Sequence, residues 1–360
     1  MTASEEQQIL ADVSQPESKT YQVSFTGSGS EYFRIWIVNL LLSIVTLGIY
    51  SAWAKVRRNQ YFYSCTHIAE GSFDYHGNAI AILKGRIAAI VILTLYNIAV
   101  RTSGTYTLIM LVILGAILPW LIWRSLQFRL YNSSYRAIRF GFRGSAGQAY
   151  MNFLLWPVLT LFTIYLLFPF AHQRIKKFQH SESRFGTTYF SFYAKVSSFY
   201  GIYLIGFISA IVAGIVAYKL MGSPFAGIQH GPHTERDPAS FIGIFMFMLA
   251  FYGIFFLIFP LILTMMQNLI WNNTKLGDHQ FHSDLRWGKM TFIIITNILG
   301  VICTLGLFTP FAHIRYLKYK LEAISLTTHG SLDNFVSAVQ DDVSATGVGM
   351  TDMLDFDLSL

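Results

Sequence analysis

The chain has 360 residues, of which 53% are hydrophobic and only 12% are charged. This balance excludes an ordinary soluble globular protein and indicates a protein with several membrane segments. The net charge of +7 does not indicate a nucleic-acid partner, because the basic residues lie beside apolar runs and among aromatic residues, as they do at a membrane interface.

Polar tails flank a series of apolar runs. Residues 1–20 lack the basic start and cleavage site of a signal peptide, so we expect a short disordered cytoplasmic tail. Residues 338–360 contain aspartates but no lysine or arginine, which predicts an acidic disordered tail. Between the tails lie seven runs of about 20 residues, the length that crosses a bilayer. They cover residues 33–53, 80–100, 105–123, 150–172, 200–221, 241–263 and 291–312.

Three of the seven runs end in versions of one motif, TLGIYSAWAKVR, TIYLLFPFAHQR and TLGLFTPFAHIR. An arginine recurs at one position, and the position two residues before it holds lysine once and histidine twice. We therefore interpret that earlier position as a replaceable cation. The aligned residues are Thr46, Lys55 and Arg57, then Thr163, His172 and Arg174, then Thr304, His313 and Arg315.

A second signature is a serine or threonine followed seven residues later by phenylalanine. Most copies carry a glycine between the two anchors, so we expect a hydroxyl at a helix end, a tight turn and a short strand with an aromatic face. Val23 and Phe25 suggest one more strand without its turn. The five copies are Thr66/Phe73, Ser133/Phe140, Ser183/Phe190, Thr274/Phe281 and Thr328/Phe335.

The order of these motifs predicts two pseudo-repeat units, residues 21–144 and 145–284, and a half-repeat, residues 285–337. The resulting fold class is an all-α polytopic membrane protein, with broken or re-entrant segments, transmembrane helices and short cytoplasmic turn-strand elements. Both termini are expected in the cytoplasm.

Charge distribution bears on how many runs cross the bilayer. Basic clusters follow each of the three motif-bearing runs, and the positive-inside tendency favours one side for all three. This holds if those runs are re-entrant and only residues 80–100, 105–123, 200–221 and 241–263 span the membrane. Seven full crossings remain the alternative. The irregular backbone of a re-entrant run would have to be buried in protein or line a wet cavity.

Candidate site residues fall into two groups, and no aspartate or glutamate lies within an apolar run. A neutral group could line a solute path or hydrogen-bond the broken backbone instead. A cationic group could bind a lipid phosphate or an anionic solute, with the histidines acting as a pH-sensitive pair, or could only anchor the segments at the interface. The neutral group is Asn39, Thr46, Thr163, Asn297 and Thr304, and the cationic group is Lys55, Arg57, His172, Arg174, His313 and Arg315.

Metal and enzyme chemistry have little support in the sequence. Cys65 and Cys303 lack partners at metal-ligand spacing. The loop GIQHGPHTERDP contains two histidines and two carboxylates, but such loops are often only solvated. No nucleotide loop, nucleophile elbow or zincin helix occurs, so we expect no catalytic residues, no metal and no cofactor.

The stretch FTGSGSEYFRIWIVNLLLSIVTLGIYSAWAKVRRNQYFYSCTHIAEGSFDYHG resembles the YjgN-like family of bacterial inner-membrane proteins, a domain family of unknown function. The likeness extends across most of residues 21–337. It implies a multi-pass protein of the bacterial cytoplasmic membrane and brings no substrate or catalytic residue.

Two functions remain open from the sequence. The first is a transporter or channel-like permease for a small, anionic solute, whose route the broken segments would line. The second is a membrane scaffold or lipid-interacting protein whose aromatic and basic residues hold anionic lipid. The lipid bilayer is the partner common to both.

Overall fold

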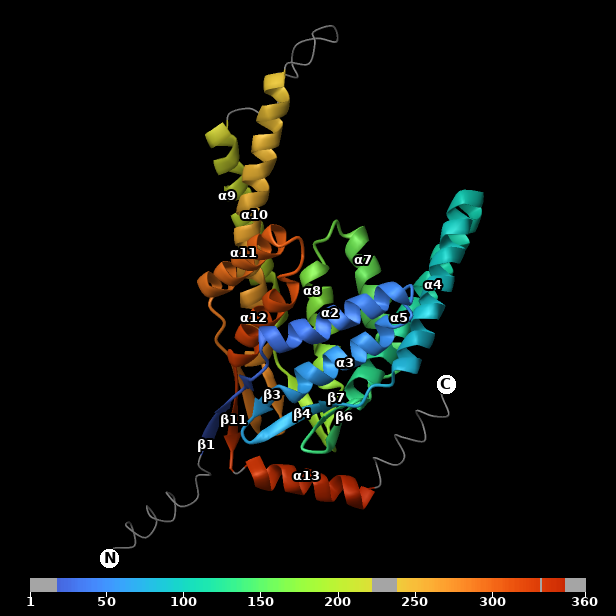
Figure 1. Ribbon diagram of the computed structural model, residues 1–360, viewed down its shortest axis with the longest axis vertical. Coiled ribbons are helices and arrows are strands. Elements are labelled where there is room, and N and C mark those ends of the chain that lie inside the picture. Colours follow the sequence, from blue (N-terminus) through green and yellow to red (C-terminus); the bar gives the residue numbers. More distant parts are fainter. Residues whose placement is uncertain (1–17, 222–237, 331, 347–360) are drawn as a thin grey trace, which may run out of the picture.

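The computed structural model describes residues 18–221, 238–330 and 332–346 (Figure 1). Its helices are α2 (Gly29–Val45), α3 (Ser51–Ser64), α4 (Ala79–Thr102), α5 (Gly104–Tyr131), α6 (Ala146–Tyr150), the π-helix η1 (Met151–Leu155), α7 (Trp156–Phe162), α8 (Phe168–Ser181), α9 (Val196–Met221), α10 (Pro238–Asn272), α11 (Trp287–Cys303), α12 (Thr309–Glu322) and α13 (Leu332–Thr346). Its strands are β1 (Ser18–Gln22), β2 (Ser24–Phe25), β3 (Thr66–Ile68), β4 (Gly71–Tyr75), β5 (Ser133–Tyr135), β6 (Ile138–Phe142), β7 (Ser183–Phe185), β8 (Thr188–Phe192), β9 (Thr274–Leu276), β10 (His279–Ser283) and β11 (Ile324–His329).

All eleven strands in the described residues belong to one sheet, in the order β1-β11-β10-β9-β8-β7-β6-β5-β4-β3-β2. The two ends of this sheet come from a single segment, because β1 pairs with β11 and β2 pairs with β3. Between them, the amide of Val23 donates to the carbonyl of Ile324 at 2.9 Å. The sheet therefore nearly closes on itself, and neither end is left as a long unpaired edge.

The expectation of an all-α fold is wrong, because this antiparallel sheet draws strands from all three predicted units. Each strand has only two to six residues, too few for a clear alternation of apolar and polar positions. Closure also depends on contacts between distant residues, such as the pair of hydroxyls of Thr20 and Thr327 at 3.1 Å. The predicted turn-strands are thus the parts of a continuous sheet.

Four of the five predicted hydroxyls end a helix as expected. Each donates to the carbonyl four residues earlier, which satisfies one of the free acceptors at a helix end. The four bonds are Thr66 to Phe62 at 2.7 Å, Ser133 to Arg129 at 2.8 Å, Ser183 to Gln179 at 2.6 Å and Thr274 to Ile270 at 2.8 Å.

The turn-strand predicted at the fifth copy of the hydroxyl signature is wrong. Thr328 lies inside β11, and Phe335 lies in α13. The strand after α12 begins at Ile324, which has no hydroxyl. The spacing from Thr328 to Phe335 therefore does not mark a hairpin.

The remaining four phenylalanines form a row of stacked rings on one face of the sheet. Phe140 lies 6.3 Å from Phe73 and 6.4 Å from Phe190, and Phe190 lies 6.1 Å from Phe281, between ring centroids. These rings pack against a buried cluster that includes Ile68, Tyr135, Phe185, Leu276 and Leu326, contributed by five different strands. The sheet therefore encloses an apolar core.

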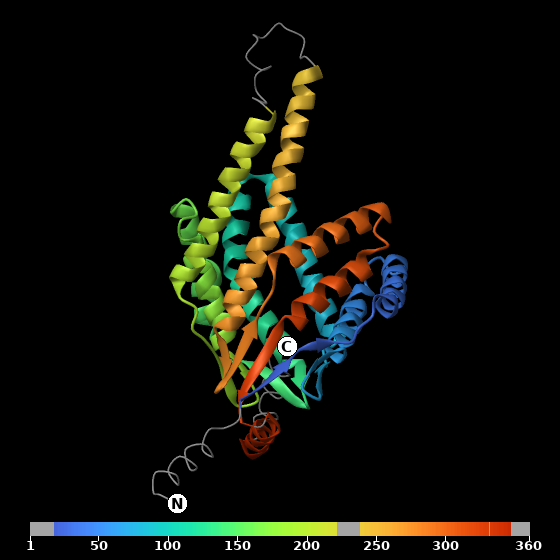
Figure 2. The same ribbon diagram turned by 90° about the vertical axis from the view of Figure 1, so that its left-hand side faces the viewer.

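Helix α13 covers this core from beneath the sheet (Figure 2). Leu332, Val336 and Val339 of α13 belong to the buried cluster. The tail predicted over residues 338–360 is therefore helical in its first part, up to Thr346, and residues 18–20 of the other predicted tail belong to β1. Residues 1–17 and 347–360 lie outside the described part of the chain.

Helical pairs alternate with the β-hairpins along the chain. The pairs α2–α3, α7–α8 and α11–α12 are short, whereas α4–α5 and α9–α10 rise well above them (Figure 1). Neighbouring pairs pack side by side, and α12 packs against α2, so the helices form a closed ring above the sheet. Helices that leave this ring downwards continue directly into strands.

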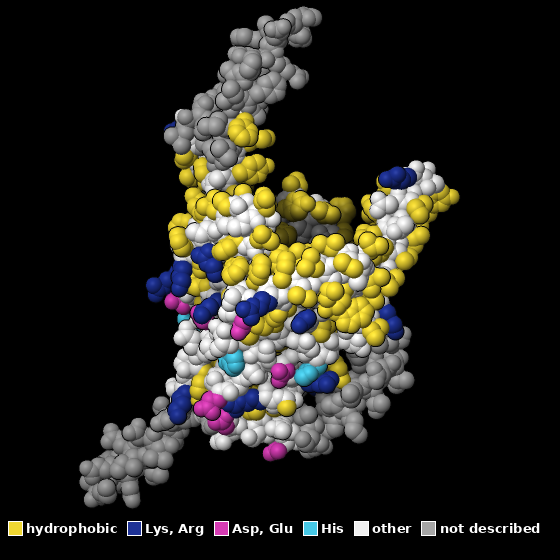
Figure 3. Space-filling view, viewed as in Figure 1, with side chains coloured by type: hydrophobic (Ala, Val, Ile, Leu, Met, Phe, Trp, Pro, Cys, Tyr) yellow, Lys and Arg dark blue, Asp and Glu magenta, His cyan; other side chains and the backbone are white. Residues whose placement is uncertain are grey.

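Four of the helices are long and apolar enough to cross a membrane: Ala79–Thr102, Gly104–Tyr131, Val196–Val216 and Tyr252–Asn272. They correspond to the four runs that the charge distribution favours as spans. Hydrophobic side chains gather over the upper half of the molecule, and charged side chains gather lower down, beside the sheet (Figure 3).

The row of phenylalanines gives a direct test of the core. Phe190→Ala should lower the free energy of unfolding by about 3 kcal/mol, because a ring stacked between two others leaves a cavity. Thermal unfolding of the detergent-purified protein measures this loss. Tyr189→Ala, which changes the exposed neighbour on β8, should cost less than about 1 kcal/mol. Equal losses in the two variants would contradict the enclosed core.

Candidate functional site

The three predicted threonines lie in the turns that join the short helical pairs. Each hydroxyl donates to a carbonyl of the first helix and accepts the amide of the residue four positions later. The bonds are Thr46 to Leu42 at 2.7 Å and from Tyr50 at 3.0 Å, Thr163 to Leu159 at 3.2 Å and from Leu167 at 3.2 Å, and Thr304 to Gly300 at 2.7 Å and from Phe308 at 2.9 Å. These hydroxyls thus satisfy backbone groups at a chain reversal, the second of the two readings of this group.

Each of these three turns also exposes an apolar side chain almost completely. Leu47, Ile164 and Leu305 are 94%, 85% and 96% exposed, respectively. All three have positive φ angles, near 50°, which an L residue adopts only when the surrounding turn enforces it. The tips of the short pairs are therefore ordered, apolar and uncovered.

Asn297 and Arg315 lie together within the α11–α12 pair. The Asn297 amide nitrogen donates to the carbonyl of Ala312 at 2.9 Å, and its oxygen accepts from Arg315 at 2.9 Å. Arg315 also donates to the hydroxyl of Thr296 at 3.1 Å. Both predicted residues therefore hold one helix of the pair against the other.

His172 and Arg174 lie on α8, away from this pair. The Nδ1 atom of His172 is 2.8 Å from the hydroxyl of Tyr203, and its ring meets that of Phe199 edge to face. Burial, with a smaller effect from Lys176, lowers the pKa of His172 to about 4. Arg174 stacks over the ring of Phe170, 4.9 Å from its centroid.

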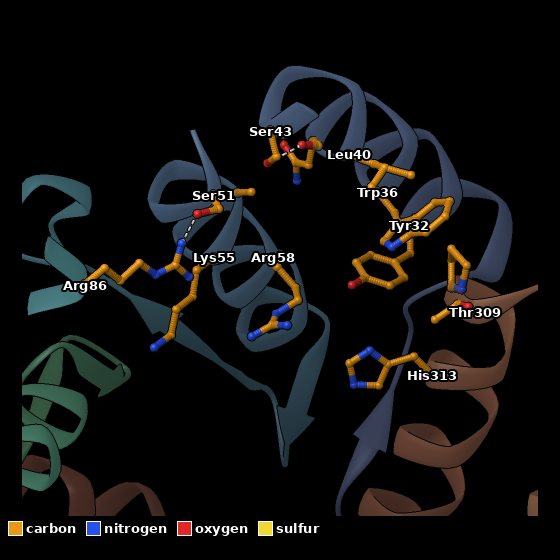
Figure 4. Close-up of a pocket in the computed structure, with 13 residues that line it drawn as sticks. Tyr32, Trp36, Leu40, Ser43, Ser51, Lys55, Arg58, Arg86, Thr309 and His313 are labelled. Atoms are coloured by element: carbon orange, nitrogen blue, oxygen red, sulfur yellow. Dashed lines mark hydrogen bonds between the residues drawn. The ribbon is translucent and has the colours of Figure 1, made fainter. Parts of the chain in front are cut away.

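A cleft of about 330 Å³ collects the other predicted residues. It lies between α2, α3 and α12, with one side chain from α4 (Figure 4). Helix α2 and helix α3 each present one face to it, because the lining positions recur at helical spacing. The lining residues are Tyr32, Trp36, Asn39, Leu40 and Ser43 from α2, Ser51, Ala54, Lys55 and Arg58 from α3, Arg86 from α4, and Thr309, Pro310 and His313 from α12.

The cleft is strongly basic. Lys55, Arg58 and Arg86 line it, and no carboxylate is among its lining residues. Arg86 donates to the hydroxyl of Ser51, whereas Lys55 and Arg58 make no ion pair within the described part of the chain. Burial, followed by the charges of Arg86, Arg58 and Arg129, lowers the pKa of Lys55. Like charges held this close favour an anion between them.

Aromatic rings form the opposite wall of the cleft. Arg58 and His313 point into the same gap, with Tyr32 beside them (Figure 4). The His313 ring lies edge to face against Tyr32 at 5.9 Å and against Phe62 at 4.9 Å. Burial, and then the Arg58 charge, lowers the pKa of His313, which favours the neutral ring. His313 can then offer a hydrogen bond without adding to the local charge.

Asn39 adds an unused polar group to the cleft. It is only 7% exposed, and its amide oxygen has no hydrogen-bond partner. Its counterpart seven residues before the other turn, Asn297, is satisfied on both amide atoms. Since buried polar groups are nearly always paired, the Asn39 oxygen is an acceptor open to a bound donor.

The structure brings Lys55, His313 and Asn39 together at the cleft, and Asn297 and Arg315 together within the α11–α12 pair, and leaves the other predicted residues apart. Thr46, Thr163 and Thr304 lie at three separate turns, and the two predicted histidines contact different aromatic clusters. The loop with the possible metal ligands, at 227–238, lies almost entirely outside the described residues.

The candidate site residues predicted from the sequence did not include Arg58, Arg86 and Tyr32. They included the recurrent Arg57, which is exposed and does not line the cleft. Helical spacing from Lys55 identifies Arg58, three positions later on the same face. No local signal identifies Arg86 or Tyr32, because they reach the cleft from other helices.

Comparison with known proteins gives a family and partial relatives. The signature of the family described as "Bacterial protein of unknown function (DUF898)" matches residues 20–353. The inner membrane protein YjgN of Salmonella typhimurium is 32% identical over 158 residues, which is 43% of this chain and 40% of that protein. The protein of the same name in Escherichia coli O157:H7 is 28% identical over 159 residues, 42% of this chain and 38% of that protein.

These matches confirm the resemblance to the YjgN-like family. The matched region spans about two fifths of the length of these curated relatives. No solved structure matches this chain.

The pKa of His172 predicts a pH effect on stability. Between the ordinary histidine pKa of about 6.5 and the folded value, the unfolded chain binds a proton that the folded chain does not. The melting temperature should therefore fall as pH drops from 7 to 5, and less so in His172→Gln. His282→Gln, which changes an exposed histidine on β10, should follow the wild type. An unchanged pH response in His172→Gln would contradict the burial effect.

Proposed function

The chain belongs to the DUF898 family of bacterial proteins of unknown function, and we propose that it is an inner-membrane protein that binds an anionic lipid headgroup in the cleft between α2, α3 and α12. The observation that carries this proposal is the meeting of three basic side chains, with no carboxylate, beside exposed apolar helices. Such a combination matches a ligand with a negative head and an apolar tail.

Two findings support the inner-membrane location. The relatives are named inner membrane proteins, and four helices of this chain have the length and composition of membrane spans. A lipid ligand would then be present at high local concentration beside the cleft.

The three short helical pairs fit a re-entrant placement. Their tips carry fully exposed leucine and isoleucine side chains, which are costly in water and stable in lipid. The threonine hydroxyls satisfy backbone groups at these tips, as an apolar surrounding requires. In this arrangement the tips enter one leaflet, and the cleft lies directly behind them, because its residues come from the first half of α3 and the first turns of α12. The long side chains of Lys55 and Arg58 would then extend towards the headgroups.

The cleft chemistry favours a phosphodiester that also carries a hydroxyl. Arg58, Lys55 and Arg86 would hold the phosphate, because charge-assisted hydrogen bonds from such groups are stronger than neutral ones. The unpaired oxygen of Asn39 would accept from a headgroup hydroxyl. Phosphatidylglycerol offers both groups, so it is the probe of choice.

Passage of a small anionic solute is the second candidate. It is favoured by three basic residues on different helices, Arg129 of α5, Lys176 of α8 and Lys320 of α12, since the charges of the other two help to lower the pKa of Lys176. Binding ranks first because the five predicted path residues lie in three separate helical pairs and four of them already bond the backbone.

Lipid binding can be measured by native mass spectrometry of the protein in an uncharged detergent. Arg58→Gln should weaken phosphatidylglycerol binding about tenfold, because it removes one charge-assisted contact. Lys55→Gln should have a similar effect. In both variants, lipid binding should depend less on salt concentration than it does in the wild type.

Lys318→Gln is the matched control for this measurement. Lys318 lies on α12 near the cleft helices but is exposed and pairs with Glu322 at 3.7 Å. Phosphatidylcholine, which has no net charge, should bind weakly to every variant. Equal binding of the two lipids by the wild type, or full binding by Arg58→Gln, would overturn the proposed function.

The re-entrant placement has its own test. In a Cys65→Ser/Cys303→Ser background, Leu47→Cys and Leu305→Cys should resist a membrane-impermeant maleimide in native membranes and react after detergent is added. Lys195→Cys should react in inside-out vesicles and not in intact cells. Labelling of Lys195→Cys from the periplasm would contradict the re-entrant placement.

A further inference from the structure

The lower ends of α8, α10 and α12 meet directly above the aromatic core of the sheet. The ring of His180 on α8 lies 6.1 Å from that of Trp271 on α10, and Trp271 lies 5.2 Å from Phe281. One turn earlier on the same face of α10, the side-chain amide of Gln267 donates to the carbonyl of Lys320 on α12 at 3.1 Å. Gln267 and Trp271 are one turn apart, so α8 and α12 flank the same stretch of α10.

Three basic residues from three helices gather at this level. Lys176 lies one turn before His180 on α8, Lys320 lies near the end of α12, and Arg129 lies near the end of α5. Burial, followed by the charges of Arg129 and Lys320, lowers the pKa of Lys176. Burial also lowers the pKa of Lys320. Lys176 is therefore close enough to Arg129 and to Lys320 to be repelled by both. The lower ends of α5 and α8 also pack together, because Leu126 and Leu130 of α5 share an apolar cluster with Phe178 of α8.

No carboxylate offsets this repulsion in the part of the chain that the structure describes. The ion pairs found there join other residues: Arg136 to Asp333, Arg286 to Asp284 and Lys318 to Glu322. The contacts of these cations are neutral instead, with Lys176 Nζ donating to the Gln179 side chain at 3.3 Å and Lys320 Nζ lying 5.9 Å from the Tyr316 ring. Partly buried like charges destabilise a fold unless a counter-charge joins them.

We propose that Arg129, Lys176 and Lys320 form a second anion site, inside the ring of helices, that binds a phosphate-bearing oxyanion. Three donors on three different helices can surround a tetrahedral oxyanion, which has several acceptor oxygens. Trp271 and the row of phenylalanines lie below these cations, and we refer to the three cations above this aromatic layer as the chamber.

This chamber is distinct from the lipid cleft. None of its three cations lines the cleft: they come from α5, α8 and α12, whereas the cations of the cleft come from α3 and α4. Lys55 connects the two places, because its pKa responds to Arg129 as well as to Arg58 and Arg86. A small oxyanion could thus exchange between them along a basic path.

The test uses the full chain, purified in an uncharged detergent, and inorganic phosphate as the probe. An Arg58→Gln background weakens the cleft, so that a remaining response reports on the chamber. In this background, adding phosphate at constant ionic strength should raise the melting temperature relative to chloride, because a ligand of the folded state stabilises it.

Adding Lys176→Gln or Lys320→Gln should weaken the response to phosphate about tenfold, as expected for the loss of one charge-assisted contact. Lys318→Gln, two residues from Lys320 but exposed and ion-paired, should leave it unchanged. Without phosphate, the two chamber variants should be at least as stable as their parent, because one repelling charge is gone. Should either variant fail to fold, Arg129→Gln tests the same site from α5.

Two outcomes would overturn the proposal. One is a phosphate response that disappears in Arg58→Gln alone, which would place all phosphate in the cleft. The other is a response that survives Lys176→Gln and Lys320→Gln unchanged. A short-chain phosphatidylglycerol arm separates the sources of phosphate: the chamber should respond to inorganic phosphate and not to the lipid, and the reverse result would reject a chamber for free oxyanions. Since lipid binding to the wild-type cleft is measured separately, failure of either site is recognised independently.

Discussion

The closure of the sheet by residues 18–25 is the constraint on which the rest of the molecule depends. A two-stranded hairpin of three-residue and five-residue strands is not stable alone in water. Joined side by side, the hairpins satisfy one another's backbone groups, and the N-terminal segment pairs with both remaining ends through β1 and β2. The apolar rings inside, covered by α13, then form a core that no single hairpin could bury.

Closure also sets the positions of the helices. Each hairpin begins where a helix ends, so a closed sheet arranges the helical pairs in a ring and returns α12 to α2. Basic side chains from two different helices, Lys55 and Arg58 of α3 and Arg86 of α4, meet at one cleft as a result. The described ion pairs involve none of these three cations, so the proposed anion would relieve their repulsion.

In the proposed re-entrant placement, the short helical pairs bring an irregular backbone into an apolar environment. A reversal of the chain frees amide and carbonyl groups, and in lipid each free group is costly. A single threonine at each turn bonds one group on either side of the reversal, which leaves the apolar tip free to face lipid. The three turns thus combine local hydrogen bonding with exposed leucine and isoleucine, a combination unsuited to water.

Local features of this protein were determined by the sequence itself: the membrane class, the four long apolar helices, four hydroxyls that end helices, and Lys55 and His313 as members of a basic site. These depend on composition, on helical length or on bonds spanning four residues. The all-α expectation failed, and Arg57 was selected where Arg58 faces the cleft, because those features depend on contacts between distant segments. Strands of two to six residues are too short for their apolar periodicity to predict a sheet. Only the tertiary structure pairs Thr20 with Thr327 and brings Arg86 to Arg58, since the energy of such contacts comes from burial and hydrogen bonding across the whole chain.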